Sequence, residues 1–343
     1  MKRKLKAGVI GLGRAGFMHL RNISSMTEIE IVAVADMMVD KLSEELDQLN
    51  ITKDARYSDY KDLLKQDDVE AVFIFTSTNT HEEIVLEAAK HKKHIMCEKP
   101  LSMSLDEKDT INVLNVVKEN GVKLQMAFNR RFDPQFRKTY EMVREGKIGD
   151  PQIVKITSRD PDLLPHDLIL RIGTLIFDFT MHDFDMARYM MGSEVVEVYA
   201  KGNTLIDPTL KNINDVDTLV IILQFANGGY AIIDNSRKAV YGYDQRVEVF
   251  GSKGMLKAEN YSASTVEYYN ENAVELAKPL PMFQVRYTDA YKNEVKMFAN
   301  SILNDAPIVC VGLDALKAQR IGIAAQKSLE TGLPVKIDIV EEI

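Results

Sequence analysis

A glycine-rich turn places the strongest constraint on how this chain can fold. Gly11-Leu12-Gly13-Arg14-Ala15-Gly16 follows the apolar run Ala7–Ile10 and opens a segment of helical period. The first glycine permits a tight turn, the second lets a bound group approach the backbone, and the third allows helix and strand to pack closely. This spacing between a strand and a helix predicts a dinucleotide site, with the pyrophosphate at the helix N-terminus.

Asp36 supports the same interpretation, because it ends the next apolar run and lies 20 residues beyond Gly16. Its carboxylate can accept hydrogen bonds from the hydroxyls of the adenosine ribose. It would repel a 2′-phosphate, and Met37 and Met38 supply no cation to neutralise one. The cofactor expected is therefore NAD. The alternative is an ordinary glycine-rich turn in which Asp36 caps a helix.

The first third of the sequence alternates strand and helix signals. Short apolar runs rich in Val, Ile and Phe occur at Ala7–Ile10, Ile29–Ala35, Ala71–Phe75 and His94–Cys97. Such alternation predicts βαβ units and an open parallel sheet. Two capping boxes, Thr80 with Glu83 and Ser104 with Glu107, predict helix starts.

The pattern changes beyond about Gln125, where β-rich stretches follow one another. Asn227-Gly228-Gly229 joins two of them as a hairpin signal, and Ile176–Met191 has helical period. The fold class predicted is α/β + α+β. An N-terminal Rossmann domain that binds NAD is expected over residues 1–124. A C-terminal antiparallel-sheet domain for substrate binding and oligomerisation is expected over residues 125–343.

Charge and composition argue against several classes of function. Lys and Arg number 43 against 51 for Asp and Glu, and there is no long basic run, so nucleic-acid binding is not expected. Apolar stretches such as Leu219–Phe225 are too short to cross a bilayer. Cys97 and Cys310 cannot form a disulfide scaffold, and neither they nor the histidines have metal-ligand spacing, so no metal site is predicted. We expect a cytoplasmic protein without membrane attachment.

Four segments together resemble the Gfo/Idh/MocA family of oxidoreductases. They are the glycine-rich turn, Thr76–His81, Glu98-Lys99-Pro100 and Asp178–Asp185. The resemblance covers essentially the whole chain. The segments most similar to the inositol 2-dehydrogenase branch of that family are Phe128–Asp133, Ser158–Pro161 and Tyr241–Arg246.

Lys99 is the first candidate for chemistry. It follows the run His94–Cys97, at the carboxyl edge where open α/β sheets bind ligands, and Pro100 restricts its backbone to extended conformations. The alternative is a solvated surface lysine. The resemblance implies that Lys99 contacts both the substrate and the nicotinamide ribose, and that the Lys99–Pro100 bond is cis.

Asp178 and His182 are four residues apart in a segment of helical period, so they share one face. The carboxylate can bind one ring nitrogen of His182 and leave the other to accept the proton of a substrate hydroxyl. The alternative is that Asp178 caps the helix and His182 is structural. The family context favours the catalytic interpretation, with Asp185 as a structural partner.

The resemblance also implies further binding residues. Those expected at the cofactor are Gly11, Gly13, Arg14, Ala15, Gly16, Asp36, Thr76, Thr78, Asn79, His81, Glu98 and Lys99. Those expected at the substrate are Lys99, Arg130, Asp160, Asp178, His182 and Tyr241, with Tyr243 as a competitor for the role of Tyr241.

The function that the resemblance implies is NAD-dependent oxidation of a CH–OH group. The substrate expected is myo-inositol, converted to 2-keto-myo-inositol (scyllo-inosose) by hydride transfer. One alternative is a dehydrogenase for another inositol isomer or sugar, and another is a non-catalytic NAD-binding sensor or co-repressor. The strands around Thr218–Phe225 and Tyr230–Ile233 are apolar on both faces, which favours a homotetramer formed through the sheet.

Overall fold

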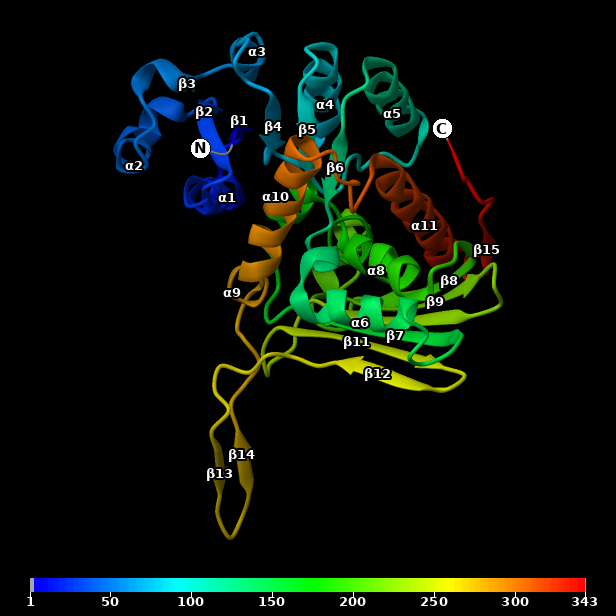
Figure 1. Ribbon diagram of the computed structural model, residues 1–343. Coiled ribbons are helices and arrows are strands. Elements are labelled where there is room, and N and C mark those ends of the chain that lie inside the picture. Colours follow the sequence, from blue (N-terminus) through cyan, green and yellow to red (C-terminus); the bar gives the residue numbers. More distant parts are fainter. Residues whose placement is uncertain (1–2, 343) are drawn as a thin grey trace. The chain divides into compact units, whose positions relative to one another are not determined.

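The computed structural model describes residues 3–342 and divides the chain into two compact units (Figure 1). Unit 1 comprises Met1–Phe132, Ala290–Gln319 and Glu341–Ile343, and unit 2 comprises Asp133–Asp289 and Arg320–Val340. The first crossing between units lies a few residues beyond the boundary expected at residue 124. Residues 290–319 group with unit 1 because Val295 and Phe298 belong to its hydrophobic core.

Unit 1 is built on a parallel six-stranded sheet in the order β3-β2-β1-β4-β5-β6. The strands are β1 (Leu5–Ile10), β2 (Ile29–Ala35), β3 (Arg56–Tyr57), β4 (Ala71–Ile74), β5 (His94–Glu98) and β6 (Leu124–Ala127). The order reverses between β1 and β4, and open α/β sheets bind ligands at the carboxyl ends of the strands beside such a reversal. The predicted Rossmann sheet is confirmed.

Helices complete unit 1. They are α1 (Arg14–Ser24), α2 (Ser43–Gln48), α3 (Tyr60–Leu64), α4 (His81–Lys90), α5 (Lys108–Asn120), most of α10 (Thr288–Leu303) and the first part of α11 (Gly312–Thr331), with short 3₁₀ turns η1 (Val39–Leu42), η2 (Lys53–Ala55), η3 (Thr78–Thr80) and η4 (Asn129–Phe132). Residues of β4 are buried on both faces, as in a parallel sheet that is covered on both sides.

The two capping boxes are corrected by the structure. Thr80 does precede α4, but its hydroxyl oxygen lies 2.7 Å from Thr76 Oγ1 and 2.8 Å from Ser77 O instead of capping the helix. The second box is wrong, because α5 begins only at Lys108. Ser104 Oγ instead accepts the amide of Asp106 in a local turn, which competes with helix formation.

Unit 2 contains a seven-stranded sheet in the order β12-β11-β7-β10-β9-β8-β15. The strands are β7 (Pro151–Arg159), β8 (Val195–Asn203), β9 (Thr218–Phe225), β10 (Tyr230–Ser236), β11 (Asp244–Gly251), β12 (Gly254–Ala258) and β15 (Val335–Lys336). The sheet is antiparallel as predicted, except that β10 runs parallel to β7. The long connection through two helices and two strands between β7 and β10 makes this parallel pairing possible.

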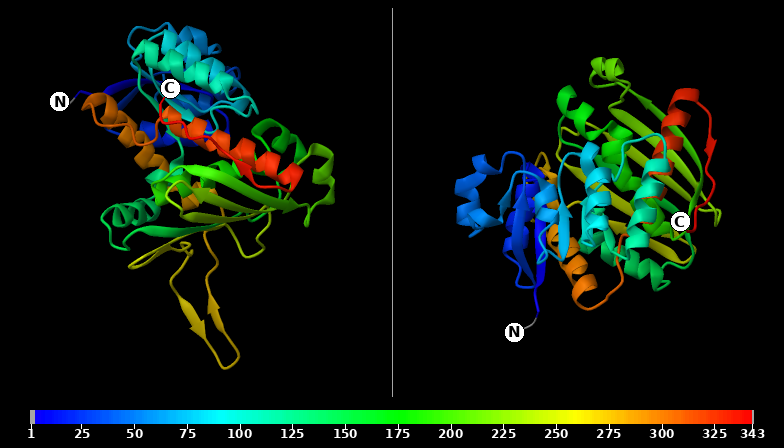
Figure 2. Two further views of the ribbon diagram at one scale, coloured as in Figure 1. Left: turned by 90° about the vertical axis from the view of Figure 1, so that its right-hand side faces the viewer. Right: turned by 90° about the horizontal axis from the view of Figure 1, so that it is seen from above.

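The helices of unit 2 are α6 (Pro134–Arg144), α7 (His166–Ile172), α8 (Met181–Met191), α9 (Phe283–Arg286) and the last part of α11, together with the 3₁₀ turn η6 (Pro208–Ile213). Figure 2 shows α6 and α8 on one side of the sheet. The expected helix over Ile176–Met191 is divided. A π-helical segment, η5 (Leu175–Thr180), precedes α8 and gives the chain a wider turn there.

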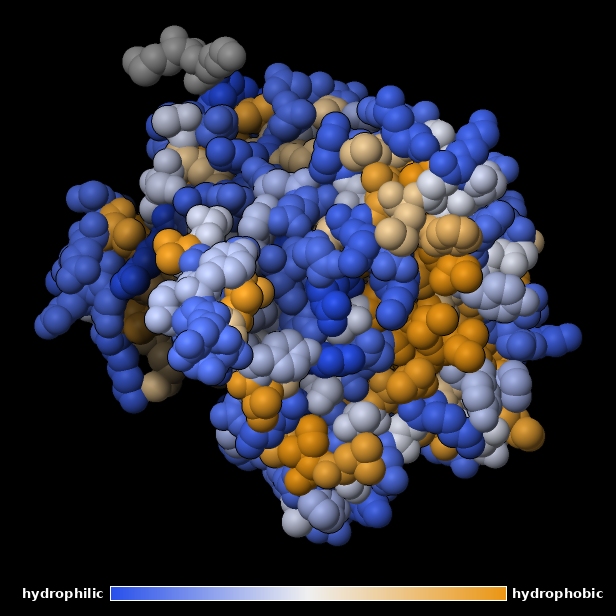
Figure 3. Space-filling model, turned by 90° about the horizontal axis from the view of Figure 1, so that it is seen from below, coloured by the Kyte–Doolittle hydropathy of each residue, from blue (hydrophilic) through white to orange (hydrophobic). Residues whose placement is uncertain are grey.

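The other side of this sheet, which we call the open face, carries exposed apolar side chains. Along β9, Leu219, Ile221 and Leu223 are buried, whereas Val220 and Ile222 are exposed. The larger exposed side chains on the open face are Ile153, Val220, Ile222, Tyr230, Ile232, Phe250 and Met255. Figure 3, seen from below, shows an apolar area on this part of the surface.

A two-stranded ribbon of β13 (Glu267–Tyr269) and β14 (Val274–Leu276) extends away from the open face (Figures 1 and 2). All six of its strand residues are exposed. An isolated hairpin of this kind is only marginally stable by itself. Between residues 3 and 342, no helix is long and apolar enough to cross a membrane.

Candidate active site

The glycine-rich turn of unit 1 has the geometry that its spacing predicts. Gly11 has φ +91°, and a Cβ there would lie 2.7 Å from the amide nitrogen of Thr76. A Cβ on Gly16 would clash with the carbonyl of Gly11. A Cβ on Gly13 would meet nothing within 4 Å, so space lies over this residue. The turn therefore leaves open the one glycine at which a pyrophosphate is expected to approach.

The helix that follows the turn presents its N-terminus at the same place. Gly13 is the N-cap of α1, with extended backbone and no side chain to cap the first turn. The amides of Arg14, Ala15 and Gly16 are first-turn amides, which have no acceptor within the helix. Together with the positive end of the helix dipole, they suit a phosphate group.

Asp36 lies just beyond β2, at the carboxyl edge of the sheet. Its Oδ2 accepts the amide of Leu12 at 2.7 Å, and its Oδ1 accepts the amide of Met38 at 2.8 Å. The carboxylate therefore joins the end of β2 to the glycine-rich turn. Met37 and Met38 are exposed beside it, so the adjoining chain provides no positive charge there.

The loops after β4 and β5 are joined by His81. Its Nδ1 lies 2.8 Å from Pro100 O, and its Nε2 lies 3.2 Å from Thr76 O. Burial lowers the pKa of His81, because desolvation disfavours the charged ring. His81 thus holds these loops in place, and both ring nitrogens already face backbone carbonyls. Thr78 and Asn79 lie in η3 on the same β4 loop.

Glu98 and Lys99 lie at the carboxyl end of β5. The amide of Lys99 donates to Glu98 Oε2 at 3.1 Å, and the Lys99–Pro100 bond is cis, as predicted. Glu98 Oε1 lies 3.3 Å from Nε2 of the buried His19. The backbone of Lys99 is therefore fixed by contacts on both sides, through Glu98 and through the carbonyl of Pro100.

Arg130 follows β6 in η4 and is only 3% exposed. The next residue, Arg131, pairs with Asp314 at 2.9 Å and donates to Val309 O at 3.1 Å. Arg131 thus has a clear structural role. Of these two arginines, Arg130 stays a candidate for substrate binding.

In unit 2, the structure brings Asp160 and Asp178 together around Arg237. Arg237 Nη1 lies 3.6 Å from Asp160 Oδ2 and 3.5 Å from Asp178 Oδ2. The guanidinium is 1% exposed and lies over the ring of Phe179, 5.9 Å from its centroid. A buried cation is costly unless charge balances it, so the two carboxylates and the arginine form one electrostatic group.

Buried polar contacts to the sheet hold the segment that carries Asp178 and His182. Thr180 Oγ1 donates to Asn235 Oδ1 at 2.8 Å. Asp183 accepts Ser158 Oγ at 2.6 Å and Asn235 Nδ2 at 2.8 Å. These contacts fix the junction between η5 and α8 on β7 and β10. Asp185 lies 3.7 Å from Arg188, in keeping with a structural role.

Tyr241 has a different environment from the group around Arg237. Its hydroxyl donates to Asp244 Oδ2 at 2.6 Å and accepts from Arg159 Nη1 at 2.9 Å. Burial and the carboxylate of Asp244 raise the pKa of Tyr241. Tyr243 is buried and packs edge-on against Tyr287, with ring centroids 6.1 Å apart. The hydroxyl of Tyr241 is thus engaged by open-face side chains from β7 and β11.

Sequence reasoning missed Arg237, because it lies beyond the apolar run Tyr230–Ile233 and matches no motif. The only local signal was its place before Tyr241–Arg246, which the resemblance had marked. It also missed the approach of Glu294 to His19 and Glu98, since these residues come from segments far apart in the chain.

Comparisons with known proteins agree with this geometry. The model of the oxidoreductase family with an NAD-binding Rossmann fold matches residues 5–128, and that of the GFO/IDH/MocA C-terminal domain matches residues 136–257. The uncharacterized oxidoreductase YrbE of Bacillus subtilis is 47% identical over 100% of this chain and 99% of its own. The myo-inositol 2-dehydrogenase of Thermotoga maritima is 44% identical over 98% of this chain and 99% of its own.

The chain is also similar to a solved structure that contains bound ligands. The scyllo-inositol dehydrogenase of Lactobacillus casei, with bound NAD(H) and scyllo-inositol, is 27% identical and has a TM-score of 0.89. The alignment covers 97% of this chain and 99% of that one. The chain belongs to the Gfo/Idh/MocA family, in which it is an NAD-binding dehydrogenase of the inositol dehydrogenase group.

Proposed function

We propose that this chain oxidises myo-inositol at C2 to 2-keto-myo-inositol (scyllo-inosose), with NAD as the hydride acceptor. The observation that carries the proposal is the group of Asp160, Arg237 and Asp178, with His182 one helical turn beyond Asp178. It offers ionic hydrogen-bonding groups for a polyhydroxylated ring beside a histidine able to accept a proton. The likeness to the Thermotoga maritima enzyme favours myo-inositol as the isomer.

The residues of unit 1 suit NAD. Space over Gly13, the first amides of α1 and the carboxylate of Asp36 offer places for a pyrophosphate and a ribose. When bound, the nicotinamide accepts a hydride from the carbon that bears the reacting hydroxyl. The protein must then bind and orient the polyol, remove the hydroxyl proton and stabilise charge on the oxygen.

His182 is the proposed general base. In its neutral form it accepts the hydroxyl proton, while the carboxylate of Asp178 orients the ring and stabilises the imidazolium that forms. Arg237, whose Nη1 lies 3.5 Å from Asp178 Oδ2, is proposed to keep that carboxylate in place. Lys99 is proposed to hydrogen-bond the reacting oxygen and to offset the negative charge that develops on it.

Arg130 and Asp160 are proposed to bind other hydroxyls of the ring. A planar guanidinium can donate to two neighbouring hydroxyls, and a carboxylate can accept from two. Tyr241 is the weaker candidate, because its hydroxyl already bridges Arg159 and Asp244.

The test is the formation of reduced nicotinamide, followed by absorbance, with NAD and a panel of polyols. The panel holds myo-inositol, scyllo-inositol, other inositol isomers and simple sugars. We expect the highest kcat/KM with myo-inositol, and chromatographic identification of the 2-ketone as product. A clear preference for scyllo-inositol would support the alternative that the Lactobacillus casei structure represents. NAD binding without reduction on any polyol would support the sensor alternative.

We also propose that the protein assembles as a homotetramer through the open face. The exposed apolar side chains there lie on adjacent strands, and Ile232 is directly opposite Ile222 in the β9–β10 register. Contiguous apolar surface of this kind is typical of an interface between subunits. The exposed ribbon β13–β14 extends from the same side and would contribute further contacts.

A further inference from the structure

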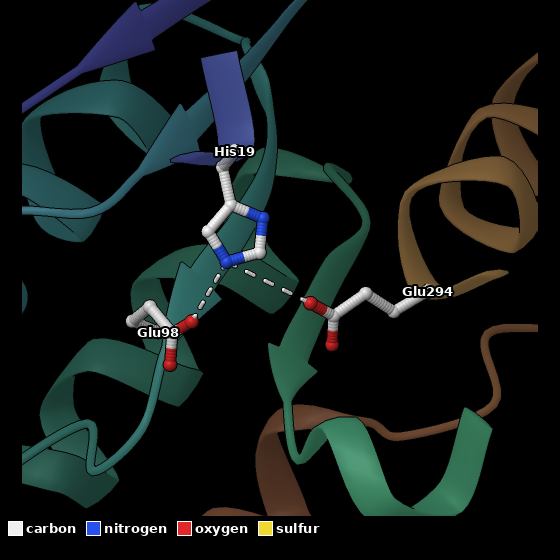
Figure 4. A group of neighbouring side chains, drawn as sticks. All are labelled: His19, Glu98 and Glu294. Atoms are coloured by element: carbon white, nitrogen blue, oxygen red, sulfur yellow. Dashed lines mark ion pairs between the residues drawn. The ribbon is translucent and has the colours of Figure 1, made fainter. Parts of the chain in front are cut away.

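Three ionisable side chains meet inside unit 1, and one of them, Glu98, immediately precedes Lys99 in the chain (Figure 4). They are His19 from α1, Glu98 from the end of β5 and Glu294 from α10. His19 Nε2 lies 3.3 Å from Glu98 Oε1 and 4.0 Å from Glu294 Oε1. The side chains of His19 and Glu294 are both fully buried.

The surroundings of this cluster hold its members in place. The ring of His19 stacks on Phe75, with centroids 4.1 Å apart and planes 8° from parallel, and Tyr291 packs edge-on at 5.0 Å. The backbone carbonyl of Glu294 accepts Gln125 Nε2 at 2.9 Å, which ties α10 to β6. The cluster is therefore a built feature of the interior and not a chance surface contact.

The charge state of the cluster follows from its burial. Neither carboxyl oxygen of Glu294 has a hydrogen-bond partner among residues 3–342. Burial, and then the nearby carboxylate of Glu98, raise the pKa of Glu294 well above its ordinary value. Burial alone would also raise the pKa of Glu98, but His19, Lys99 and His81 together lower it. Glu98 is therefore the anion of the pair and Glu294 the neutral acid.

Glu98 connects this cluster to the candidate catalytic lysine. One carboxylate oxygen faces His19, and the other accepts the amide of Lys99 at 3.1 Å. Any change that moves or reprotonates Glu98 must therefore alter the backbone of Lys99.

We propose that Glu294 is a positioning residue for Lys99 and acts through His19 and Glu98. The role of Lys99 itself rests on the proposed function. A neutral Glu294 beside His19 leaves the single negative charge of the cluster on Glu98, where it holds the lysine loop. An ionised Glu294 would compete for His19 and repel Glu98, so the loop would lose its fixed acceptor.

The experiment measures the reactivity of the Lys99 side chain directly, and it uses no inositol. Trace acetylation of the purified full chain is followed by mass spectrometry of the peptide that contains Lys99, from neutral to alkaline pH. Three variants are compared with the unchanged protein. Glu294→Gln keeps the shape and neutrality of the acid, and Glu294→Met keeps the volume but removes the polar group. Asp289→Asn is the matched control, because Asp289 is an exposed acid on the same helix.

We expect Glu294→Met to change the acetylation rate of Lys99 by about tenfold, because it removes the polar group that faces His19 Nε2 at 4.0 Å. Glu294→Gln and Asp289→Asn should leave the rate close to that of the unchanged protein. Should Glu294→Met fail to fold, His19→Gln tests the same connection from its other end, with the same expected change. Equal rates in all folded variants would overturn the proposal, as would equal loss in the Gln and Met variants.

Two further measurements separate this proposal from its rivals. Because the pKa of Glu294 is raised in the folded state, the unchanged protein should lose stability as pH rises above the ordinary glutamate range, whereas Glu294→Gln should not. A purified protein that contains one divalent cation per chain, removable by a chelator with a change in Lys99 labelling, would overturn the proposal in favour of a metal site. Because no readout uses a polyol, failure of the proposed inositol oxidation would leave this test intact.

Discussion

Arg237 lies 3.5 Å from the carboxylate of Asp178 with its guanidinium almost wholly removed from solvent. The same Nη1 atom lies 3.6 Å from Asp160, so one buried cation serves two carboxylates. Both carboxylates belong to the proposed substrate site. We propose that Arg237 is a positioning residue, which fixes Asp178 so that its carboxylate can orient His182.

Replacing Arg237 tests this arrangement. Arg237→Met leaves two partly buried carboxylates without their cation, and we expect kcat/KM for inositol to fall by about 10²-fold or more. Arg237→Lys keeps the positive charge but loses the planar guanidinium with its several donors, so kcat/KM should recover only in part. The measurement is steady-state kinetics together with the Kd of NAD, which should hardly change. Lys238→Gln is the control, because Lys238 is exposed and next in sequence. Unchanged kinetics in Arg237→Met would show that Arg237 serves folding alone.

His182→Ala should lower kcat by about 10²–10⁴-fold if His182 is the general base, with little effect on NAD binding. Oxidation by the unchanged enzyme should decline at low pH, because protonated His182 cannot accept a proton. Asp178→Asn should keep the shape of the site but reduce kcat, since the amide orients the ring less well. The measurement is kcat and kcat/KM across pH, with His166→Ala as the control, since His166 pairs with Asp207 outside the site. If kcat of His182→Ala declined at low pH as it does in the unchanged protein, His182 would not be the general base.

Asp36 should make NAD far better than NADP as a cofactor. The carboxylate would repel a 2′-phosphate, and the exposed Met37 and Met38 offer no compensating charge. Asp36→Ala should narrow the difference in kcat/KM between NAD and NADP, chiefly by weakening the binding of NAD. The amide of Leu12 also loses its acceptor in this variant. Asp40→Ala, an exposed acid on the following turn, should leave the ratio unchanged. Equal efficiency of the two cofactors with the unchanged protein would be incompatible with this role for Asp36.

The open face should be an interface between copies of this chain. The double change of Ile222→Lys and Ile232→Lys places two charges opposite each other on adjacent strands, so the assembly should dissociate. Light scattering at micromolar concentration gives the mass. Leu205→Lys is the control, because Leu205 is an exposed apolar residue outside the patch. A monomer mass for the unchanged protein would refute the homotetramer.

Asp217 should contribute to stability in a pH-dependent way. Burial alone would raise its pKa, but three backbone amides, of Leu205, Ile206 and Asp207, donate to its carboxylate and lower the pKa overall. Its contribution is therefore present above the ordinary aspartate range and is lost as pH falls through the folded-state value.

Asp217→Asn should destabilise the protein by about 1–3 kcal/mol at neutral pH, because an amide nitrogen would face donors. The free energy of unfolding should also depend less on pH in the acid range. Chemical denaturation at several pH values measures both effects. Asp162→Asn is the control: it changes a mostly exposed carboxylate and should alter neither the stability nor its pH dependence.

The sequence was most informative where a local pattern dictates the backbone. The spacing of Gly11, Gly13 and Gly16 predicted a turn in which two glycines have no room for a side chain, and the structure has that turn. Apolar runs predicted the parallel strands because a strand covered on both faces must be apolar throughout. Pro100 similarly indicated the form of the lysine loop.

Sequence alone could not supply contacts between distant segments. Glu294 lies 275 positions after His19, and no spacing rule relates a residue of α10 to one of α1. Arg237 was missed for the same reason, since one of its partners follows β7 and the other lies in η5. The π-helical turn was also missed, because its apolar residues fit an ordinary helix equally well.

That turn makes the spacing of Asp178 and His182 depend on chain length. A π turn holds one more residue than an α turn, so the segment Leu175–Thr180 behaves as an α-helix with an insertion. Deleting Thr180 would allow the helix to rewind as a regular α-helix. The separation of Asp178 and His182 would then fall from four residues to three. Residues three and four apart lie on one helix face but approach each other from opposite sides, so the carboxylate would meet the ring from a different direction in a chain that still folds.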